Sequence, residues 1–218
     1  YETAQTNRRA AQEALIKLQV DNNVDPEAMI ASIRTQITNY ETLLIEKELE
    51  LAALLDNQRP NQAKVDGARG DVNDLSFRTM GPGLHVTTGP AAIFWNPGNT
   101  GSGTYTVSAT FTQTTASSHL NSFGLFFGGQ DLDGDGQRYT YFLIREDGQF
   151  LIKKRMGGDT ENLTSGWAAH SAVNALENGR MNNTISVEVG ASNVRFLSNG
   201  TEVVSLPKAG MDVDGIAG

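Results

Sequence analysis

The six residues "DLDGDG", 131–136, point most directly to chemistry by their types and spacing. Asp131, Asp133 and Asp135 are spaced like the first three ligands of a calcium-binding loop, and Gly136 permits the sharp turn that such a loop needs. The twelfth position, a bidentate acidic residue in an EF-hand, is Phe142 here. The motif therefore predicts a Ca²⁺ site with a different closing ligand. The alternative is a solvated acidic loop between two strands.

Two tryptophans and two polar residues are candidates for binding a sugar. An aromatic face suits the apolar surface of a pyranose ring, and Asn side chains suit its hydroxyl groups. Trp95 is followed by Asn96 at an expected strand end, Trp167 follows Gly166 in a loop, and His119 lies in a Ser-rich loop. We predict Trp95, Asn96, His119 and Trp167 as carbohydrate-binding residues. The alternatives are core packing for the tryptophans and an ordinary surface position for the histidine.

The acidic residues do not form the pattern of a glycoside hydrolase. Such an enzyme needs two carboxylates facing each other across the sugar, and no expected strand carries two acidic residues on one face. Glu188 is alone on an expected solvent face, whereas Glu146 and Asp147 are adjacent in an expected turn. The three histidines accompany no nucleophile elbow or zinc-binding helix. We predict no catalytic residue, so the sequence favours a binding module over an enzyme.

A short basic segment, "IKKR", lies in this otherwise acidic region. Strand alternation turns Lys153 and Arg155 to the same side, where they could meet an acidic glycan. The alternative is a charged solvent face that protects an edge strand from pairing with other chains.

Charge and composition exclude several partners. The formal net charge is −8 and the isoelectric point is near 4.9, which argues against a nucleic acid or an anionic membrane surface as the main partner. No segment approaches the roughly 18 consecutive apolar residues that suggest a membrane span. Cysteine is absent, so disulfides and thiolate metal sites are excluded.

The composition changes sharply at Leu75. All nine Phe and both Trp lie beyond it, as do all glycines except Gly67 and Gly70. We therefore predict two parts: a helical coiled-coil segment, 1–75, and a β-sandwich, 76–218. The expected fold class is α+β in separate parts.

The first part has the spacing of a helical hairpin or stalk. Asp25 and Pro26 are an N-cap followed by the residue favoured at the first helical position. Apolar residues then recur at heptad spacing, with Lys47 at the one missed position: Ile30, Ile33, Ile37, Tyr40, Leu44, Leu51 and Leu54. A third helical stretch is expected from Val65 to Leu75. The seam predicts self-association or hairpin packing.

The second part alternates with a period of two. Tyr105, Val107, Ala109 and Phe111 share one face of an expected strand. Asp147-Gly148 and Asn199-Gly200 are hairpin turn signals. Helical spacing recurs only near "SAVNALENGR". Many short strands with Gly- and Asn-rich turns predict an antiparallel sandwich or jelly roll.

Residues ~5–75, with "LIKLQVDNNVDPEAMIASIRTQ" and the Arg59-Pro60 break, resemble the periplasmic coiled coil of capsule-export and chain-length-determinant proteins, the polysaccharide co-polymerase type. The resemblance implies an envelope protein that handles polysaccharide. The membrane helices and α/β base that flank this coiled coil in that family are absent here.

Residues 77–218, with "GPAAIFWNP", "GLFFGGQDLD" and "YFLIREDGQFLIKKR", resemble the laminin-G or concanavalin A-like sandwich domains of exported bacterial proteins. In that fold the "DGIAG" ending leads into one more strand, so the sandwich is expected to lack a strand or to be truncated. The relatives include lectin-like modules and keto-disaccharide hydrolases, and a fold does not choose among them.

The two resemblances together imply an exported protein, periplasmic or at the cell surface. We expect a non-catalytic, lectin-like module that binds a glycan or polysaccharide on an oligomerising stalk. The alternatives are a hydrolase of the keto-disaccharide type, a capsule-export or chain-length component, and a purely structural envelope protein or an engineered fusion.

Overall fold

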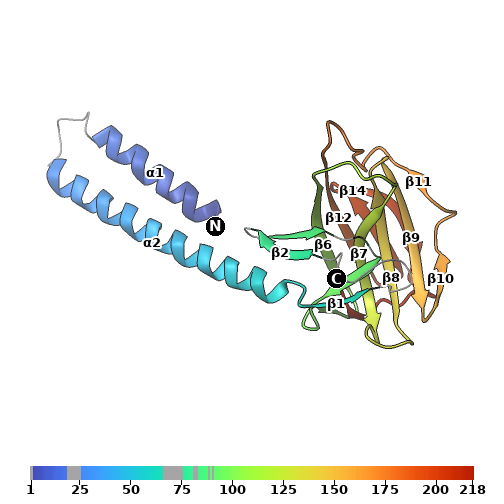
Figure 1. The fold of residues 1–218 in the computed structure, drawn as a ribbon. Helices are drawn as coiled ribbons and strands as arrows, with labels where there is room; N and C mark the ends of the chain where they lie inside the picture. Colours follow the sequence, from blue (N-terminus) through green and yellow to red (C-terminus); the bar gives the residue numbers. More distant parts are fainter. Residues whose placement is uncertain (1, 19–25, 66–75, 81–82, 88, 90) are drawn as a thin grey trace. The chain divides into compact units, whose positions relative to one another are not determined.

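The computed structural model describes residues 2–18, 26–65, 76–80, 83–87, 89 and 91–218. The chain divides into two compact units: Tyr1–Gln58 with Thr79–Leu84, and Arg59–Arg78 with His85–Gly218. The first contains a helical hairpin and the second contains an antiparallel β-sandwich (Figure 1). The predicted fold class, helices followed by an antiparallel sandwich, is confirmed.

The helical hairpin consists of α1 (Glu2–Leu18) and α2 (Pro26–Gln58), which lie antiparallel (Figure 1). Pro26 begins α2 as predicted, while the predicted cap Asp25 lies outside the described residues. Ala11 and Ile33 are each 9% exposed, and Arg8 forms an ion pair of 3.5 Å with Glu41. The ion pair joins the two helices, and the buried Ile33 belongs to the predicted seam. Neither described helix combines the length and apolar character that crossing a membrane requires.

The third expected helical stretch is wrong at its beginning. Val65 ends a strand, β1 (Gln62–Val65), which pairs antiparallel with β4 (Ala92–Trp95). Val65 stands opposite Ala92 in this pair, so it belongs to a strand and not to a helical heptad. The rest of the expected helix, 66–75, lies outside the described residues.

The sandwich has two principal sheets. The large sheet contains, in spatial order, β10 (Asp159–Asn162), β9 (Gln149–Met156), β8 (Arg138–Arg145), β7 (Ser122–Gln130), β15 (Gly215–Ile216) and β5 (Thr100–Gly101). A further short strand, β11 (Ala168–Ala169), pairs with β9. The small sheet contains, also in order, β14 (Thr201–Pro207), β13 (Asn193–Ser198), β12 (Met181–Val189) and β6 (Tyr105–Gln113). A separate ribbon pairs β2 (Ser76–Met80) with β3 (Gly83–Thr87).

The two sheets enclose the main core. Alternate residues of β12 point inward, and Ile185 and Val187 are fully buried. They belong to one cluster with Phe127 of β7, Phe142 of β8 and Phe196 of β13. The ring of Phe196 lies 5.5 Å from that of Phe142, at an edge-to-face angle of 79°. Interdigitated side chains from both inner faces thus hold the sandwich together.

The opposite, outer face of the large sheet is partly covered. Phe126 and Tyr139 point away from the main core and form a second cluster with Trp95 and Leu132. Trp95 comes from β4, so the β1–β4 ribbon contributes to covering the β7 and β8 part of this face. The second cluster contains no residue of β9, β10 or β11, which form the rest of this face.

Three further segments can be compared with what the sequence indicated: the Asn199-Gly200 turn, the "SAVNALENGR" segment and the "DGIAG" ending. Asn199 and Gly200 have φ values of 52° and 80°, which is the backbone of the predicted hairpin turn. The helical spacing near "SAVNALENGR" does not correspond to a helix, because this segment is a loop that ends in a tight turn. The backbones of Glu177 and Arg180 exchange two hydrogen bonds there, each of 3.0 Å. The "DGIAG" ending itself contains strand β15, paired with β7 and β5.

Candidate functional site

The turn between β8 and β9 brings together the polar side chains that form our candidate site. Gly148 has a φ of 78°, which only glycine adopts readily, and its N–H donates to the carbonyl of Arg145 at 3.1 Å. The turn sets the register of the hairpin so that Arg145 stands opposite Gln149. Both residues share the outer face of the large sheet with Tyr141, because strand neighbours two apart point the same way.

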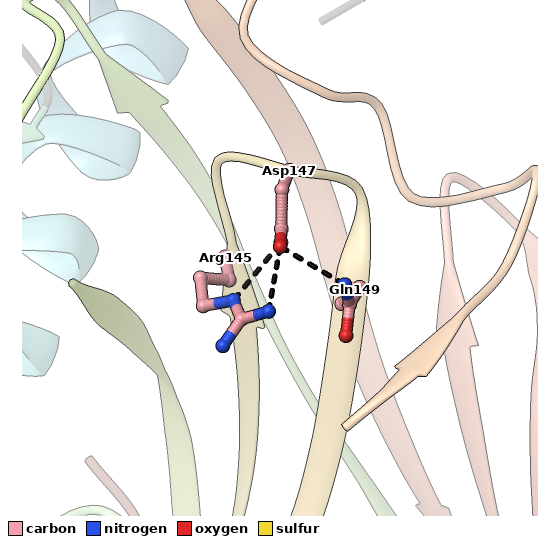
Figure 2. Close-up of polar contacts among 3 residues, drawn as sticks. All are labelled: Arg145, Asp147 and Gln149. Atoms are coloured by element: carbon pink, nitrogen blue, oxygen red, sulfur yellow. Dashed lines mark hydrogen bonds and ion pairs between the residues drawn. The ribbon is translucent and has the colours of Figure 1, made fainter. Parts of the chain in front are cut away.

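Asp147 ties these two side chains together (Figure 2). Arg145 donates through Nε to Oδ1 at 3.0 Å and through Nη2 to Oδ2 at 2.6 Å, and Gln149 donates to Oδ2 at 3.0 Å. This bidentate contact lowers the pKa of Asp147 and raises that of Arg145, so both groups are charged near neutral pH. The side chains of Arg145 and Asp147 are only 15% and 27% exposed. The arrangement is therefore fixed before any ligand arrives.

Trp167 completes the candidate site. The guanidinium carbon of Arg145 lies 4.4 Å from the centre of the Trp167 ring, within cation–π range. Trp167 directly precedes β11, which pairs with Gln149 and Phe150 of β9. The ring is partly exposed, unlike that of Trp95. Of the predicted sugar-binding residues, Trp167 is the one that the structure joins to charged and amide groups.

A second contact braces the same turn from the other side. Oε2 of Glu146 accepts hydrogen bonds from Gln113 at 2.6 Å and from the N–H and hydroxyl of Ser117, each at 3.2 Å. These bonds, the one from the Ser117 N–H first, lower the pKa of Glu146. The loop that follows β6 is thus bound to the turn. His119 lies exposed in this loop and stays a prediction for the site.

The contacts to Asp147 use only part of the hydrogen-bonding capacity of Arg145 and Gln149. Arg145 has five N–H donors, and its contacts to Asp147 use one on Nε and one on Nη2. Gln149 keeps its amide oxygen as an acceptor after donating to Asp147. An apolar ring beside fixed donors and an acceptor matches the two surfaces of a sugar, its CH groups and its hydroxyls.

The carboxylates of the turn are poorly suited to acid catalysis. A glycoside hydrolase needs one carboxyl group with a raised pKa, so that it holds the proton for the leaving group. The pKa values of Glu146 and Asp147 are both lowered by the hydrogen bonds that they accept. This pair thus provides two carboxylates and no general acid.

Trp95 and Asn96 do not join this site. Trp95 is 1% exposed in the second cluster, so the structure leaves it no free face for a sugar, and its assignment to the site is corrected. The amide of Asn96 donates to the carbonyl of Arg59 at 3.0 Å and accepts from Gly98 at 2.9 Å. Asn96 thus stabilises the turn after β4.

The acidic loop 131–136 has its own internal order. Asp131 adopts a φ of 49°, and its Oδ2 accepts from the N–H of Gly136 at 3.2 Å. The ammonium of Lys64, from β1, donates to the carbonyls of Asp133 and Gly134 at 3.3 and 2.7 Å. Within the described residues, no three acidic or histidine side chains are arranged to hold a metal ion. Calcium binding by this loop therefore stays a prediction.

Sequence reasoning missed Arg145 and Gln149. Both are ordinary strand residues, and neither has a motif. The available signal was the predicted Asp147-Gly148 turn, since a hairpin turn places the residues that flank it opposite each other. This rule would have placed Arg145 opposite Gln149 and made the two residues candidates for the site. The position of Trp167 depends on β11 and had no local signal.

Comparison with known proteins adds a solved structure and no family. No family model matches this chain, and no curated protein matches it in sequence. Among solved structures, the carbohydrate-binding module CBM66 from Bacillus subtilis is similar, with a TM-score of 0.48 and 8% identity. The likeness covers 66% of this chain and 86% of that chain.

Proposed function

We propose that the β-sandwich is a non-catalytic carbohydrate-binding module whose site is the Arg145–Asp147–Gln149–Trp167 group. The supporting observation is the exposed part of the Trp167 ring beside a guanidinium that Asp147 holds in place at 2.6 and 3.0 Å. Preorganised groups lose little conformational entropy when a ligand binds, which favours measurable affinity from a shallow surface. The lowered pKa values of Glu146 and Asp147 disfavour a general-acid role for these two carboxylates.

The experiment that tests this function is binding of the full chain to a glycan array, followed by product analysis of each bound glycan. We expect binding to at least one class of polysaccharide and no new reducing ends after long incubation. Turnover that survives purification and disappears on replacing one acidic residue would favour the keto-disaccharide hydrolase alternative. Failure to bind any glycan would favour a purely structural envelope role.

We also propose that the helical hairpin joins two copies of the chain. α1 has 17 residues and α2 has 33, so α2 continues past the beginning of α1. The seam that buries Ile33 continues at the same spacing to Leu51 and Leu54, which are 48% and 55% exposed. Apart from Lys47, which occupies the position between Leu44 and Leu51, the seam stays apolar where it changes from buried to exposed, and this suits another helix of the same kind. The occupant that we propose is α2 of a second copy.

Sedimentation of the Leu51→Asp/Leu54→Asp variant tests the second copy. Each buried leucine contributes roughly 1.5–3 kcal/mol, so two buried aspartates should leave a monomer with unchanged helicity. Thr42→Asp, on an exposed position of α2, is the matched control and should keep the mass of the wild type. If the wild type is already a monomer at high concentration, the seam does not mediate association.

The cellular setting is a proposal that rests on the sequence resemblance. An exported protein, periplasmic or at the cell surface, would present its sandwich where envelope polysaccharides occur. A role in capsule export or chain-length control depends on the resemblance of residues ~5–75, and the envelope location is tested by fractionating cells that express the full-length protein.

A further inference from the structure

Two cations extend the candidate site along the outer face of the large sheet. We propose that Lys153 and Arg155, together with Trp167 and Arg145, bind an acidic polysaccharide built from uronate sugars. The inference rests on the proposed carbohydrate-binding function and adds the chemical class of the ligand.

The strand register places these cations on the outer face. Lys153 stands opposite Tyr141, and Arg155 stands opposite Tyr139. Tyr139 belongs to the second cluster, on the side away from the main core, so its partner Arg155 lies on that side too. Lys153 is two residues away and shares the same face. Both belong to β9, the strand that also carries Gln149 of the candidate site.

The neighbours of these cations across β10 are neutral. Lys153 stands opposite Asn162, and Arg155 stands opposite Thr160. The acidic residue of this strand, Glu161, stands opposite Lys154 instead and pairs with it at 3.0 Å. Alternation therefore separates one compensated cation, Lys154, from two that point to the other face.

Neither cation is neutralised by a partner in the described part of the chain. Arg155 donates through Nε to the carbonyl of Gly157 at 2.9 Å and forms no ion pair with a described residue. Lys153 likewise forms no ion pair with any residue that the structure describes. The chain as a whole carries a net charge of −8, so these positive groups are a local exception. A polyanion repelled elsewhere on the surface would be attracted here.

The dimensions suit an extended chain. Gln149 and Arg155 are six residues apart on one strand, which corresponds to roughly 20 Å. Trp167 and Arg145 lie at the Gln149 end, and Lys153 lies between the two ends. A sugar stacked on Trp167 would thus leave the following sugars along β9, where their carboxylates reach Lys153 and Arg155. Amide and hydroxyl groups of Asn162 and Thr160 border the same path.

The test compares one polymer backbone with and without its charge. Polygalacturonate is the acidic probe, its methyl ester is the neutral probe, and alginate and hyaluronate extend the acidic set. We expect the full chain to bind at least one acidic polymer at least tenfold more tightly than the methyl ester and dextran. Raising the salt concentration should weaken this preference, because salt screens interactions between exposed charges.

Variants separate this inference from the proposed function. Lys153→Gln/Arg155→Gln should lose the preference for the acidic polymer and keep its binding to the neutral one, whereas Trp167→Ala should lose both. Lys17→Gln/Arg34→Gln, which removes two charges from exposed positions of the helical hairpin, is the matched control and should bind like the wild type. If the strand variant keeps its preference while Trp167→Ala loses binding, the charge inference is wrong and the carbohydrate function stands.

Two further outcomes have a definite meaning. Equal binding of an oligonucleotide and a polyuronate would show a general attraction for polyanions and would overturn the inference. Binding to neutral polymers alone would also overturn it. If Trp167→Ala binds every polymer like the wild type, the proposed site itself is wrong.

Discussion

The side-chain amide of Asn183 exchanges hydrogen bonds with the backbone of Asn174, accepting from its N–H at 2.8 Å and donating to its carbonyl at 3.0 Å. Asn183 is fully buried, and the amide of Asn199 also donates to it at 2.8 Å. One buried side chain thus joins β12, the turn after β13 and the loop that follows Trp167. This loop also reaches the candidate site, since Leu176 donates to the carbonyl of Glu146 at 2.7 Å.

Replacing Asn183 with alanine should therefore destabilise the sandwich. The change removes the three part-buried hydrogen bonds that Asn183 forms with Asn174 and Asn199, each worth about 0.5–1.5 kcal/mol, and empties a fully buried position. We expect the free energy of unfolding to fall by about 3 kcal/mol in urea denaturation. Asn182→Ala is the control, because Asn182 is exposed and its side chain bonds only Thr112 in the described structure, so its effect should stay within about 0.5 kcal/mol. Equal effects of the two changes would show that burial at Asn183 is unimportant.

Tyr105 predicts how the sandwich responds to alkaline pH. Burial, followed by the charge of Asp214, raises the pKa of Tyr105 to about 12, and its hydroxyl donates to the carbonyl of Val213. In the unfolded chain a tyrosine titrates near about 10. The stabilisation is therefore complete below pH ~10 and is lost as the pH rises towards 12.

Spectroscopic titration of tyrosinate measures this pKa. One of the five tyrosines should remain protonated at pH values where ordinary tyrosines have ionised, and Tyr105→Phe should remove this late step. A titration curve that is the same in shape for both proteins would show that Tyr105 ionises normally.

Lys64 provides a way to test the predicted calcium binding of the acidic loop. Its ammonium donates to the carbonyls of Asp133 and Gly134, so a calcium ion using these oxygens would compete with it. A ligand that binds only the folded state adds RT ln(1 + [L]/Kd), about 2.7 kcal/mol at a hundredfold excess. We expect calcium to raise the melting temperature of Lys64→Met more than that of the wild type, and Asp133→Asn to reduce the rise. Identical melts in calcium and in chelator for both proteins would rule out calcium binding.

The sequence predicted the strands because apolar and polar residues alternate along them, so neighbouring residues are enough to identify a strand. The burial of Ile185 and Val187 on one face of β12, and the tight turn at Asn199, follow from neighbouring residues alone. The position of Trp95 could not be predicted in this way. It depends on pairing with β1, more than 25 residues earlier, and on Phe126 and Tyr139 from strands later in the chain.

The candidate site was predicted only in part for the same reason. Trp167 was identified from its residue type, but its partner Arg145 comes from β8, on the far side of β9 from β11. Val65 shows the opposite error, in which heptad spacing over a few residues predicted a helix where long-range pairing formed a strand. Spacing between neighbouring residues thus predicts most individual strands, but it does not predict which residues from distant segments come into contact.

Titration of the full chain with its best glycan from the array tests the central claim most directly. The account predicts that Trp167→Ala lowers the affinity at least tenfold, about 1.4 kcal/mol, and that Arg145→Met has a similar effect. Arg195→Met is the matched control, since Arg195 bonds Glu188 and Glu202 at 2.6 Å on the small sheet and lies outside the proposed site. Folded Trp167→Ala and Arg145→Met proteins that bind the glycan as tightly as the wild type would contradict the proposed site.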